Sequence, residues 1–200
     1  MLVRTTHCTI TAPDYPLAPN HTYVEAFNMI TPLYEQIIAD AGTNNTIVMG
    51  DSAGGGFALA LCQKLKFDNI PQPGRIILLS PWLDITLKNP EIKILDAEDP
   101  FLGVQGLRQA GLAYAGNSDP NYFMLSPING PLTELGQITI FIGTKDLLVA
   151  DTRRLLALAH EQEVSIDYRE YEDMVHVWML LYFRESKKAQ KEIEELILST

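Results

Sequence analysis

The chain has 200 residues, of which 46% are hydrophobic and 20% are charged, as in an ordinary globular protein with a packed core. This length fits one compact domain, so we expect residues 1–200 to form a single domain. The net charge is −10 and the chain has no basic cluster, which argues against nucleic acids and anionic membranes as partners.

The cysteine content and the N-terminal residues bear on the cellular compartment. Two cysteines cannot form a disulfide framework, and we expect Cys8 and Cys62 to be buried thiols. The spacings CxxC and HExxH are absent, so we expect no metal. The first ten residues lack the apolar segment of a signal peptide, and no apolar run approaches the length of a membrane span. We therefore expect a cytoplasmic protein.

The first quarter of the chain predicts two strands and two helices. Residues 3–10 carry β-branched and apolar side chains and read as a strand, which the prolines of "APDYPLAP" end. Apolar residues at helical spacing predict a helix over 26–38, ended by Gly42. A strand at 46–50 and a helix at about 53–66 follow.

The remaining elements continue this alternation. "GRIILLSP", "QITIFIG" and "VSIDYREY" read as strands, and the first is a continuous apolar run typical of a strand covered on both faces. Between the last two strands we expect a helix capped by Asp151, and residues 186–198 form an amphipathic C-terminal helix. Strands separated by helices predict an α/β fold with a mostly parallel sheet and helices on both faces.

Residues 84–131 do not follow this alternation. They contain a helix-like stretch, "VQGLRQAGLAYAG", between irregular Pro- and Asn-rich segments. An excursion of this length is usually a lid or binding loop, so we expect a lid or insert segment. The predicted substrate pocket combines residues near its ends with the residue before the candidate nucleophile described next: Asp51, Trp82, Leu83, Phe101, Leu102 and Tyr122. The aromatic residues among them are equally well interpreted as ordinary residues of the hydrophobic core.

The stretch "IVMGDSAGGGFALAL" places Ser52 between a predicted strand and a predicted helix. Gly50 and Ser52 begin the pattern Gly-x-Ser-x-Gly, which Gly54 completes. A nucleophile on such a sharp turn occupies an unfavourable backbone conformation, and glycines two residues away let the strand and the helix approach. The alternative is a glycine-rich turn that happens to contain a serine.

A serine hydroxyl becomes a nucleophile when a base removes its proton, and a carboxylate orients that base. Of the four histidines, His176 follows the last predicted strand, where it can reach the sheet edge that carries Ser52. Asp146 directly follows another strand and is the preferred carboxylate. Asp173 is too close to the histidine in the sequence to face it, and Asp84 follows a strand that comes one too early in the chain. The order Ser52, Asp146, His176 is that of an α/β-hydrolase.

At this point the chain resembles the hormone-sensitive-lipase-like carboxylesterases, bacterial members especially. The resemblance is carried by "GDSAGGGFA", "LLSPWLD", "DPFL", "GTKDLLVAD" and "MVHVW", and by "DYPLAP" where this family usually has "DYRLAP". It extends over nearly the whole chain. It implies hydrolysis of carboxylic esters through a serine acyl-enzyme, without a cofactor, and again indicates Ser52, Asp146 and His176.

One departure from the family concerns the oxyanion hole. In the family, a strand ending in "HGGG" precedes the "DYRLAP" segment and supplies half of the oxyanion donors, but no such run precedes residue 14 here. Ala53 N–H is then the expected remaining donor, and the loss of one donor costs about 2.7–4 kcal/mol. The chain resembles an N-terminally truncated member, in which the strand at 3–10 either pairs directly with that at 46–50 or leaves a sheet edge open. An open edge predicts homo-oligomers.

Two classes of function remain. The first is a serine esterase that acts on short acyl chains, since the sequence contains no long apolar lid. The second is a catalytically impaired or non-enzymatic hydrolase scaffold that serves as a binding module, which the missing glycine loop favours and the retained catalytic residues oppose. The residues do not separate ester hydrolysis from acyl transfer or peptide cleavage.

Overall fold

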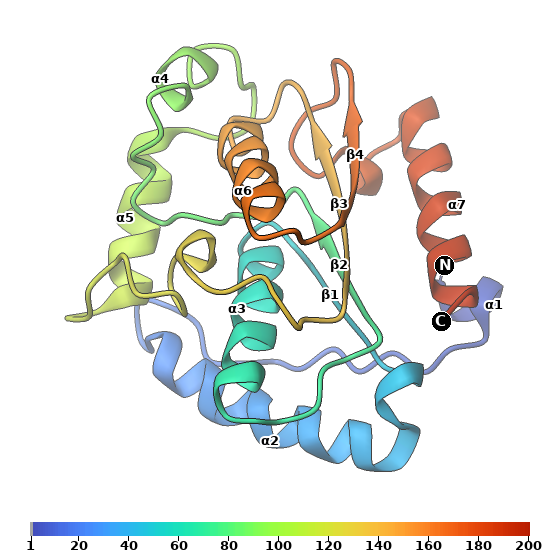
Figure 1. Cartoon of the computed structure of the whole chain (residues 1–200). Coiled ribbons are helices and arrows are strands. Elements are labelled where there is room, and N and C mark those ends of the chain that lie inside the picture. Colours follow the sequence, from blue (N-terminus) through green and yellow to red (C-terminus); the bar gives the residue numbers. More distant parts are fainter. Residues whose placement is uncertain (1) are drawn as a thin grey trace.

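The computed structural model describes residues 2–200 and contains a parallel four-stranded sheet in the order β1-β2-β3-β4 (Figure 1). The register places Ile77 of β2 between Met49 of β1 and Thr139 of β3. The carboxyl-terminal ends of the strands therefore lie at the same end of the sheet, where side chains that follow different strands can meet. The strands are β1 (Ile47–Asp51), β2 (Arg75–Leu79), β3 (Gln137–Gly143) and β4 (Ile166–Tyr171).

Helices cover both faces of the sheet, as expected for the α/β class (Figure 1). On one face lie α3 (Ala53–Phe67) and α6 (Val149–Glu161), and on the other α7 (Arg184–Leu198). Right-handed crossovers that run in the same direction through a sheet place their helices on the same face, which accounts for α3 and α6. The predicted boundaries of these helices are correct to within a few residues.

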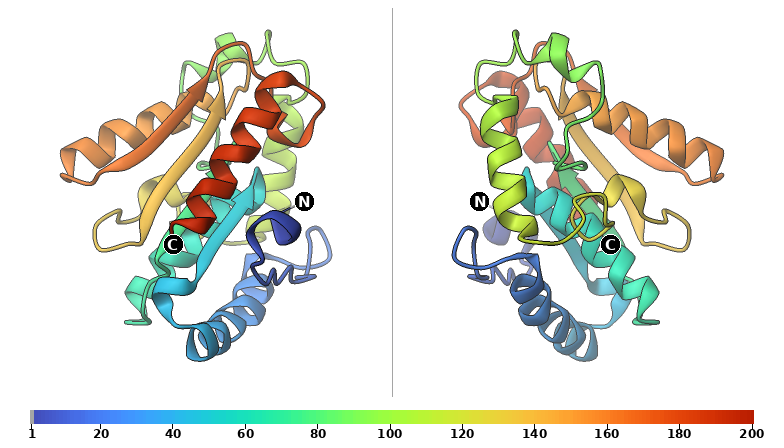
Figure 2. Two further views of the ribbon diagram at one scale, coloured as in Figure 1. Left: turned by 90° about the vertical axis from the view of Figure 1, so that its right-hand side faces the viewer. Right: turned by 90° about the vertical axis from the view of Figure 1, so that its left-hand side faces the viewer.

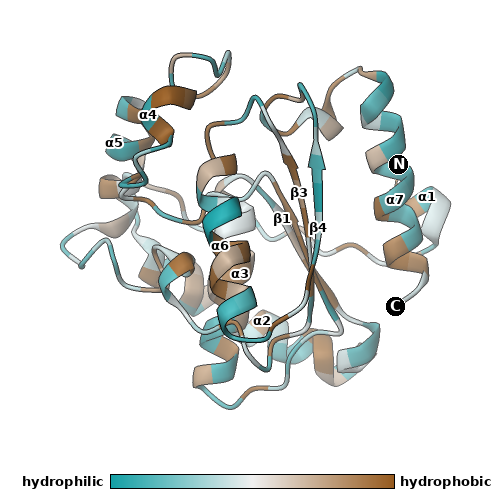
Figure 3. Ribbon diagram, turned by 45° about the horizontal axis from the view of Figure 1, so that its top comes forward, coloured by the Kyte–Doolittle hydropathy of each residue, from teal (hydrophilic) through white to brown (hydrophobic). Residues whose placement is uncertain are grey.

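The core has an apolar layer on each face of the sheet and a further apolar cluster around residues 23–34 and 82–125. In β2, Ile76 and Leu78 pack toward α3, whereas Ile77 and Leu79 pack with residues of α7 on the opposite face. Successive strand side chains point to opposite faces, so a strand buried on both sides must be apolar at every position. Figure 3 shows brown, hydrophobic stretches in β1 and β3 at the centre of the molecule, whereas β4 is mostly teal.

The prediction of a strand at residues 3–10 is wrong. Leu2–Thr6 form the short helix α1, and residues 7–22 contain no strand. A strand needs a neighbouring strand for its backbone hydrogen bonds. Here α1 instead contacts α7, and Figure 1 shows α1 beside one end of α7, whereas Figure 2 gives two further views of the same arrangement. Of the two alternatives given for this edge, direct pairing with β1 does not occur, and within residues 2–200 the outer edge of β1 has no strand beside it.

The next segment follows the prediction closely. Helix α2 (Tyr23–Ala41) begins after Thr22, whose backbone N–H and hydroxyl both donate to the Glu25 carboxylate, and ends at Gly42. The φ of Gly42 is 82°, a backbone conformation that favours glycine. The short 3-10 helix η1 (Thr43–Asn45) then leads into β1.

Residues 84–131, which we name the insert segment, lie between β2 and β3. The segment contains α4 (Ile92–Leu95), α5 (Val104–Ala115) and the 3-10 helix η2 (Pro127–Asn129). Its helix-like stretch was predicted from the sequence, and Figures 1 and 2 show α5 on the side of α3 that faces away from the sheet.

Candidate active site

Ser52 lies on the sharp turn between β1 and α3. Its φ is 52° and its ψ is −119°, a conformation that is strained for a residue with a side chain. A Cβ at Gly50 would lie 2.1 Å from the carbonyl oxygen of Gly54, so the turn requires glycine at position 50. At Gly54 an added Cβ would meet nothing within 4 Å, so the steric reason predicted for this second glycine is wrong.

Backbone hydrogen bonds hold the Ser52 peptide in place. The Ser52 N–H donates to the carbonyl of Leu79 at 2.9 Å, and the Ser52 carbonyl accepts from the N–H of Trp82 at 2.9 Å. Both partners belong to the end of β2 or to the residues directly after it. The strained turn is therefore anchored on the neighbouring strand, which offsets part of its conformational cost.

The structure brings Ser52, His176 and Asp146 together, although they are far apart in the chain. His176 Nε2 is 2.9 Å from Ser52 Oγ, and His176 Nδ1 is 2.8 Å from Asp146 Oδ2. His176 is 6% exposed and Asp146 is 0% exposed. An ionised carboxylate only accepts hydrogen bonds, so Nδ1–H donates to Asp146 and Nε2 is free to accept the Ser52 hydroxyl proton.

The loops after β3 and β4 hold the carboxylate and the imidazole. Asp146 Oδ1 accepts the N–H of Leu148 at 2.9 Å, which fixes the orientation of the carboxylate. A Cβ at Gly143 would lie 2.1 Å from the carbonyl oxygen of Met174, so glycine at the end of β3 lets the histidine loop approach closely.

Ser80, which sequence reasoning did not single out, also supports the histidine loop. It is fully buried directly after β2, and its hydroxyl accepts the N–H of Val177 at 3.1 Å. Val177 follows His176 and has a φ of 45°, an unfavourable conformation for a β-branched residue. The position of Ser80 after an apolar strand, as for Asp146, was the available sequence signal.

Ala53 is the first residue of α3, directly after Ser52. The first N–H groups of a helix have no acceptor within the helix and carry the positive end of its dipole. The Ala53 N–H therefore lies beside Ser52 with the chemical character that an oxyanion donor needs.

A cavity of about 250 Å³ borders the turn that carries Ser52. Its walls come from residues 15–18, the first turns of α3, the residues after β2, and the insert segment. The rings of Tyr15 and Phe57 stack at 5.5 Å along one wall. The lining residues are Tyr15, Pro16, Leu17, Ala18, Ala53, Gly56, Phe57, Trp82, Ile85, Ala110, Tyr114, Met124 and Leu125.

Of the six residues predicted for the substrate pocket, Trp82 lines this cavity and the other five do not. Leu83 is fully buried in the layer between the sheet and α3, and Leu102 packs against the core beneath the insert segment. Asp51 is exposed at the end of β1, and Phe101 and Tyr122 are exposed on the insert segment. These residues were chosen because they are close in the sequence to Ser52 or to the ends of the insert segment, and this closeness does not determine which way a side chain points.

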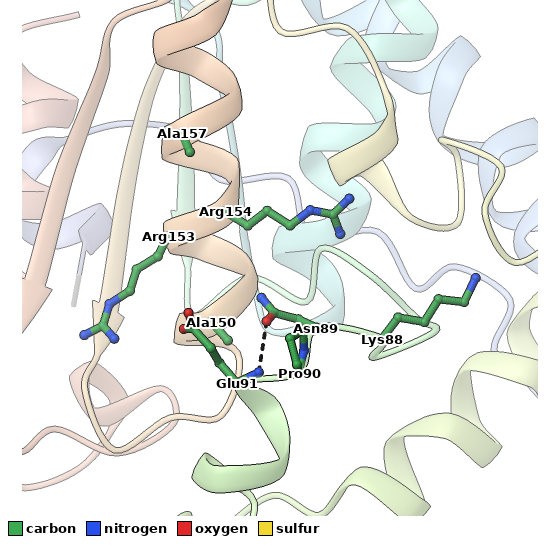
Figure 4. Close-up of a pocket in the computed structure, with 8 residues that line it drawn as sticks. All are labelled: Lys88, Asn89, Pro90, Glu91, Ala150, Arg153, Arg154 and Ala157. Atoms are coloured by element: carbon green, nitrogen blue, oxygen red, sulfur yellow. Dashed lines mark hydrogen bonds between the residues drawn. The ribbon is translucent and has the colours of Figure 1, made fainter.

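A second cavity, of about 580 Å³, lies between residues 88–91 and α6 (Figure 4). Its arginines diverge: in Figure 4, Arg153 and Arg154 point to opposite sides of α6. Arg153 pairs with Glu170 at 2.6 Å, and Arg154 lies 3.9 Å from Asp84. These cations do not converge on one point.

Asp151 does not cap α6 as predicted. It lies in the first turn of the helix, fully buried, and its Oδ1 accepts from Asn89 Nδ2 of the insert segment at 3.1 Å. Burial raises the pKa of Asp151 to about 6, the hydrogen bond from Asn89 opposes this rise, and the nearby charge of Asp84 adds to it. The carboxyl is thus held between α6 and the insert segment.

Two features are absent from the described residues. Among residues 2–200, no three His, Cys, Asp or Glu side chains are grouped so that they could hold a metal ion. No helix in the described part of the chain is long and apolar enough to cross a membrane.

Comparison with known proteins agrees with this fold. A sequence family described as alpha/beta hydrolase fold matches residues 1–180. An esterase of Acinetobacter venetianus is 31% identical over 191 residues, which cover 93% of this chain and 63% of the relative. An acetyl-hydrolase of Streptomyces hygroscopicus is 27% identical over 170 residues, or 84% of this chain and 57% of the relative. The solved structure of a hormone-sensitive lipase from a metagenome library superposes with a TM-score of 0.93 at 28% identity, covering 99% of this chain and 69% of that one.

The chain therefore belongs to the α/β-hydrolase family. Within it, the resemblance to hormone-sensitive-lipase-like carboxylesterases predicted from the motifs is confirmed. The chain spans less than two thirds of the length of the two curated relatives named above.

Proposed function

We propose that this protein is a serine carboxylesterase that hydrolyses short-chain carboxylic esters through an acyl-enzyme on Ser52. The observation that carries the proposal is the pair of hydrogen bonds at 2.9 Å and 2.8 Å that joins Ser52 to His176 and His176 to Asp146. The names of the relatives, an esterase and an acetyl-hydrolase, support the same reaction class.

In the proposed mechanism His176 acts first as a base and then as an acid. Its Nε2 takes the hydroxyl proton while Ser52 Oγ attacks the ester carbonyl carbon, and the Ala53 N–H donates to the oxyanion that forms. The C–O bond to the alcohol then breaks and the alcohol leaves with the proton from Nε2. Water repeats the two steps on the acyl-enzyme and releases the acid. Asp146 accepts from Nδ1 throughout and stabilises the imidazolium.

The cavity beside Ala53 supports the assignment to short acyl chains. Its volume of about 250 Å³ lies below the usual range for sites of drug-sized ligands, and its walls are mainly apolar and aromatic. We propose that this cavity takes the acyl group and that the insert segment forms one wall of it within a single domain. Substrates with acetyl to butanoyl groups then fit better than long-chain esters.

The proposal is tested by covalent labelling and turnover. The wild-type chain is expected to react with a fluorophosphonate at Ser52 and to hydrolyse p-nitrophenyl acetate, whereas Ser52→Ala loses both. Ser165→Ala, a serine change at an exposed position before β4, is the matched control and is expected to retain both. A folded wild-type chain with neither label nor turnover would favour a binding scaffold, and turnover that survives in Ser52→Ala would refute the site.

A further inference from the structure

The carboxylate of Asp99, in the insert segment, accepts a hydrogen bond from the loop that carries Asp146. Its Oδ2 accepts the N–H of Leu147, the residue directly after Asp146, at 2.8 Å. Its Oδ1 accepts the N–H groups of Phe101 and Leu102 at 2.8 Å and 2.9 Å. One half-buried side chain thus joins the backbone of the insert segment to the backbone beside the candidate catalytic carboxylate.

The other N–H groups of this loop are bonded without help from the insert segment. Thr144 and Lys145 donate to the carbonyls of Tyr171 and Met174, which belong to β4 and the histidine loop. Asp146 donates to Gly143, and Leu148 donates to the Asp146 side chain. The peptide between Asp146 and Leu147 is therefore held from the side of the insert segment by Asp99.

A nearby ion pair reinforces this contact. Lys145 Nζ lies 3.4 Å from the carboxylate of Glu98, and both side chains are partly exposed. Exposed ion pairs contribute little to stability. Hydrogen bonds from N–H groups to a carboxylate are stronger than neutral ones, so the Asp99 contacts dominate the link.

We propose that Asp99 is a positioning residue, which orients the Asp146 carboxylate toward His176 and makes that orientation depend on the seating of the insert segment. The role rests on the proposed esterase function. Loss of the Leu147 contact frees the peptide that carries the Asp146 carbonyl, and displacements of about 1 Å at a catalytic group cost on the order of 100-fold in rate.

The test compares Asp99→Ala with Asp96→Ala. Asp96 is the matched control because its Oδ1 accepts the N–H of Val104 at 2.8 Å, a bond that stays within the insert segment. For Asp99→Ala we expect kcat for p-nitrophenyl acetate to fall by about 10- to 100-fold with KM changed less than about twofold. For Asp96→Ala we expect both constants to stay within about twofold of wild type.

A second readout does not depend on turnover. The proton NMR signal of His176 Nδ1–H, hydrogen-bonded to Asp146 in a buried site, is expected at low field in the wild type and in Asp96→Ala. In Asp99→Ala it is expected to broaden or shift upfield. If Asp99→Ala fails to fold, Asp99→Asn replaces it in both measurements. The single amide oxygen of asparagine cannot accept on both sides as the carboxylate does, so the same changes are expected.

The outcomes separate this inference from the proposed function. Unchanged kcat and an unchanged His176 signal in the Asp99 variants, or equal losses in Asp96→Ala, overturn the positioning role while the esterase assignment stands. A wild-type chain without turnover overturns the assignment, and the NMR comparison then still decides whether Asp99 orients the Asp146–His176 pair.

Discussion

Two residues next to the same turn have opposite steric demands, although both are glycines of one motif. Gly50 faces the backbone of Gly54 and Gly55 so closely that no side chain fits, whereas the space beside Gly54 is open. The difference arises because β1 packs against the start of α3 at Gly50, while a Cβ at the partly buried Gly54 would point into open space. A motif match alone treats the two positions as equivalent.

This difference predicts opposite results for two alanine substitutions. Gly50→Ala forces the strand and helix apart, and we expect it to lower the free energy of unfolding by about 1–3 kcal/mol or more and to abolish ester turnover. Gly54→Ala places alanine in a helix with open space, and we expect a gain of about 0.5–1 kcal/mol. Urea denaturation of both variants checks this, and similar losses in the two would contradict it.

Asp151 is the residue whose charge state is most affected by burial in the contact between α6 and the insert segment. Because its folded-state pKa of about 6 lies above the ordinary value of 3.8, the folded state prefers the neutral carboxyl. This preference stabilises the folded state fully below pH 3.8, and the stabilisation is lost as the pH rises through 6. The loss in the free energy of unfolding is at most about 3 kcal/mol, because one pKa unit corresponds to about 1.4 kcal/mol.

Asp151→Asn is therefore expected to become more stable relative to wild type as the pH rises from 4 to 6, with a constant difference above about pH 7. Asparagine keeps an oxygen that can accept from Asn89. Urea denaturation at four pH values from 4 to 7 measures the difference, with Asp40→Asn at the exposed end of α2 as the control. A difference that does not change with pH would show that Asp151 is not desolvated in the folded protein.

At the scale of elements, α1 and α5 show how context selects a structure. Val3, Thr5 and Thr6 favour a strand by composition, yet they form a helix that contacts α7, with Thr5 Oγ1 donating to Glu194 at 2.9 Å. Tertiary contacts override weak local preferences. Helix α5 was predicted correctly because its apolar spacing is periodic, but which of its residues reach the cavity was not visible in the sequence.

The part of α5 that borders the cavity predicts a change in chain-length preference. Ala110 lines the cavity, whereas Leu112 is exposed on the same helix and does not. Ala110→Phe is expected to lower the ratio of kcat/KM for p-nitrophenyl butanoate over acetate by about 10-fold, since one methylene in an apolar pocket is worth about 1–3 kcal/mol. Leu112→Phe is expected to leave the ratio unchanged, and equal effects of the two variants would place the acyl group elsewhere.

For the whole molecule, the open edge of β1 supports the prediction of homo-oligomers. Within residues 2–200 no strand lies beside this edge, and unpaired edges promote association with other chains. Light scattering is expected to give a mass above the 22.3 kDa of one chain. Met49→Lys, on β1, is expected to lower that mass, whereas Met29→Lys on α2, where the methionine is likewise 40% exposed, is expected not to. A wild-type mass of one chain would refute the prediction.

The sequence by itself determined the four strands, the helices α2, α3, α5, α6 and α7, the turn at Ser52, and the three residues proposed for catalysis. These follow from local causes: apolar spacing, glycine sterics, and the rule that side chains after parallel strands meet at one edge. The tertiary structure alone decided that residues 2–6 form a helix, that Tyr15 and Ala110 border the cavity, that Asp151 is buried against Asn89, and that Asp99 reaches Leu147. Each of these depends on contacts between segments distant in the chain, and residue spacing carries no information about where a side chain points once such segments pack together.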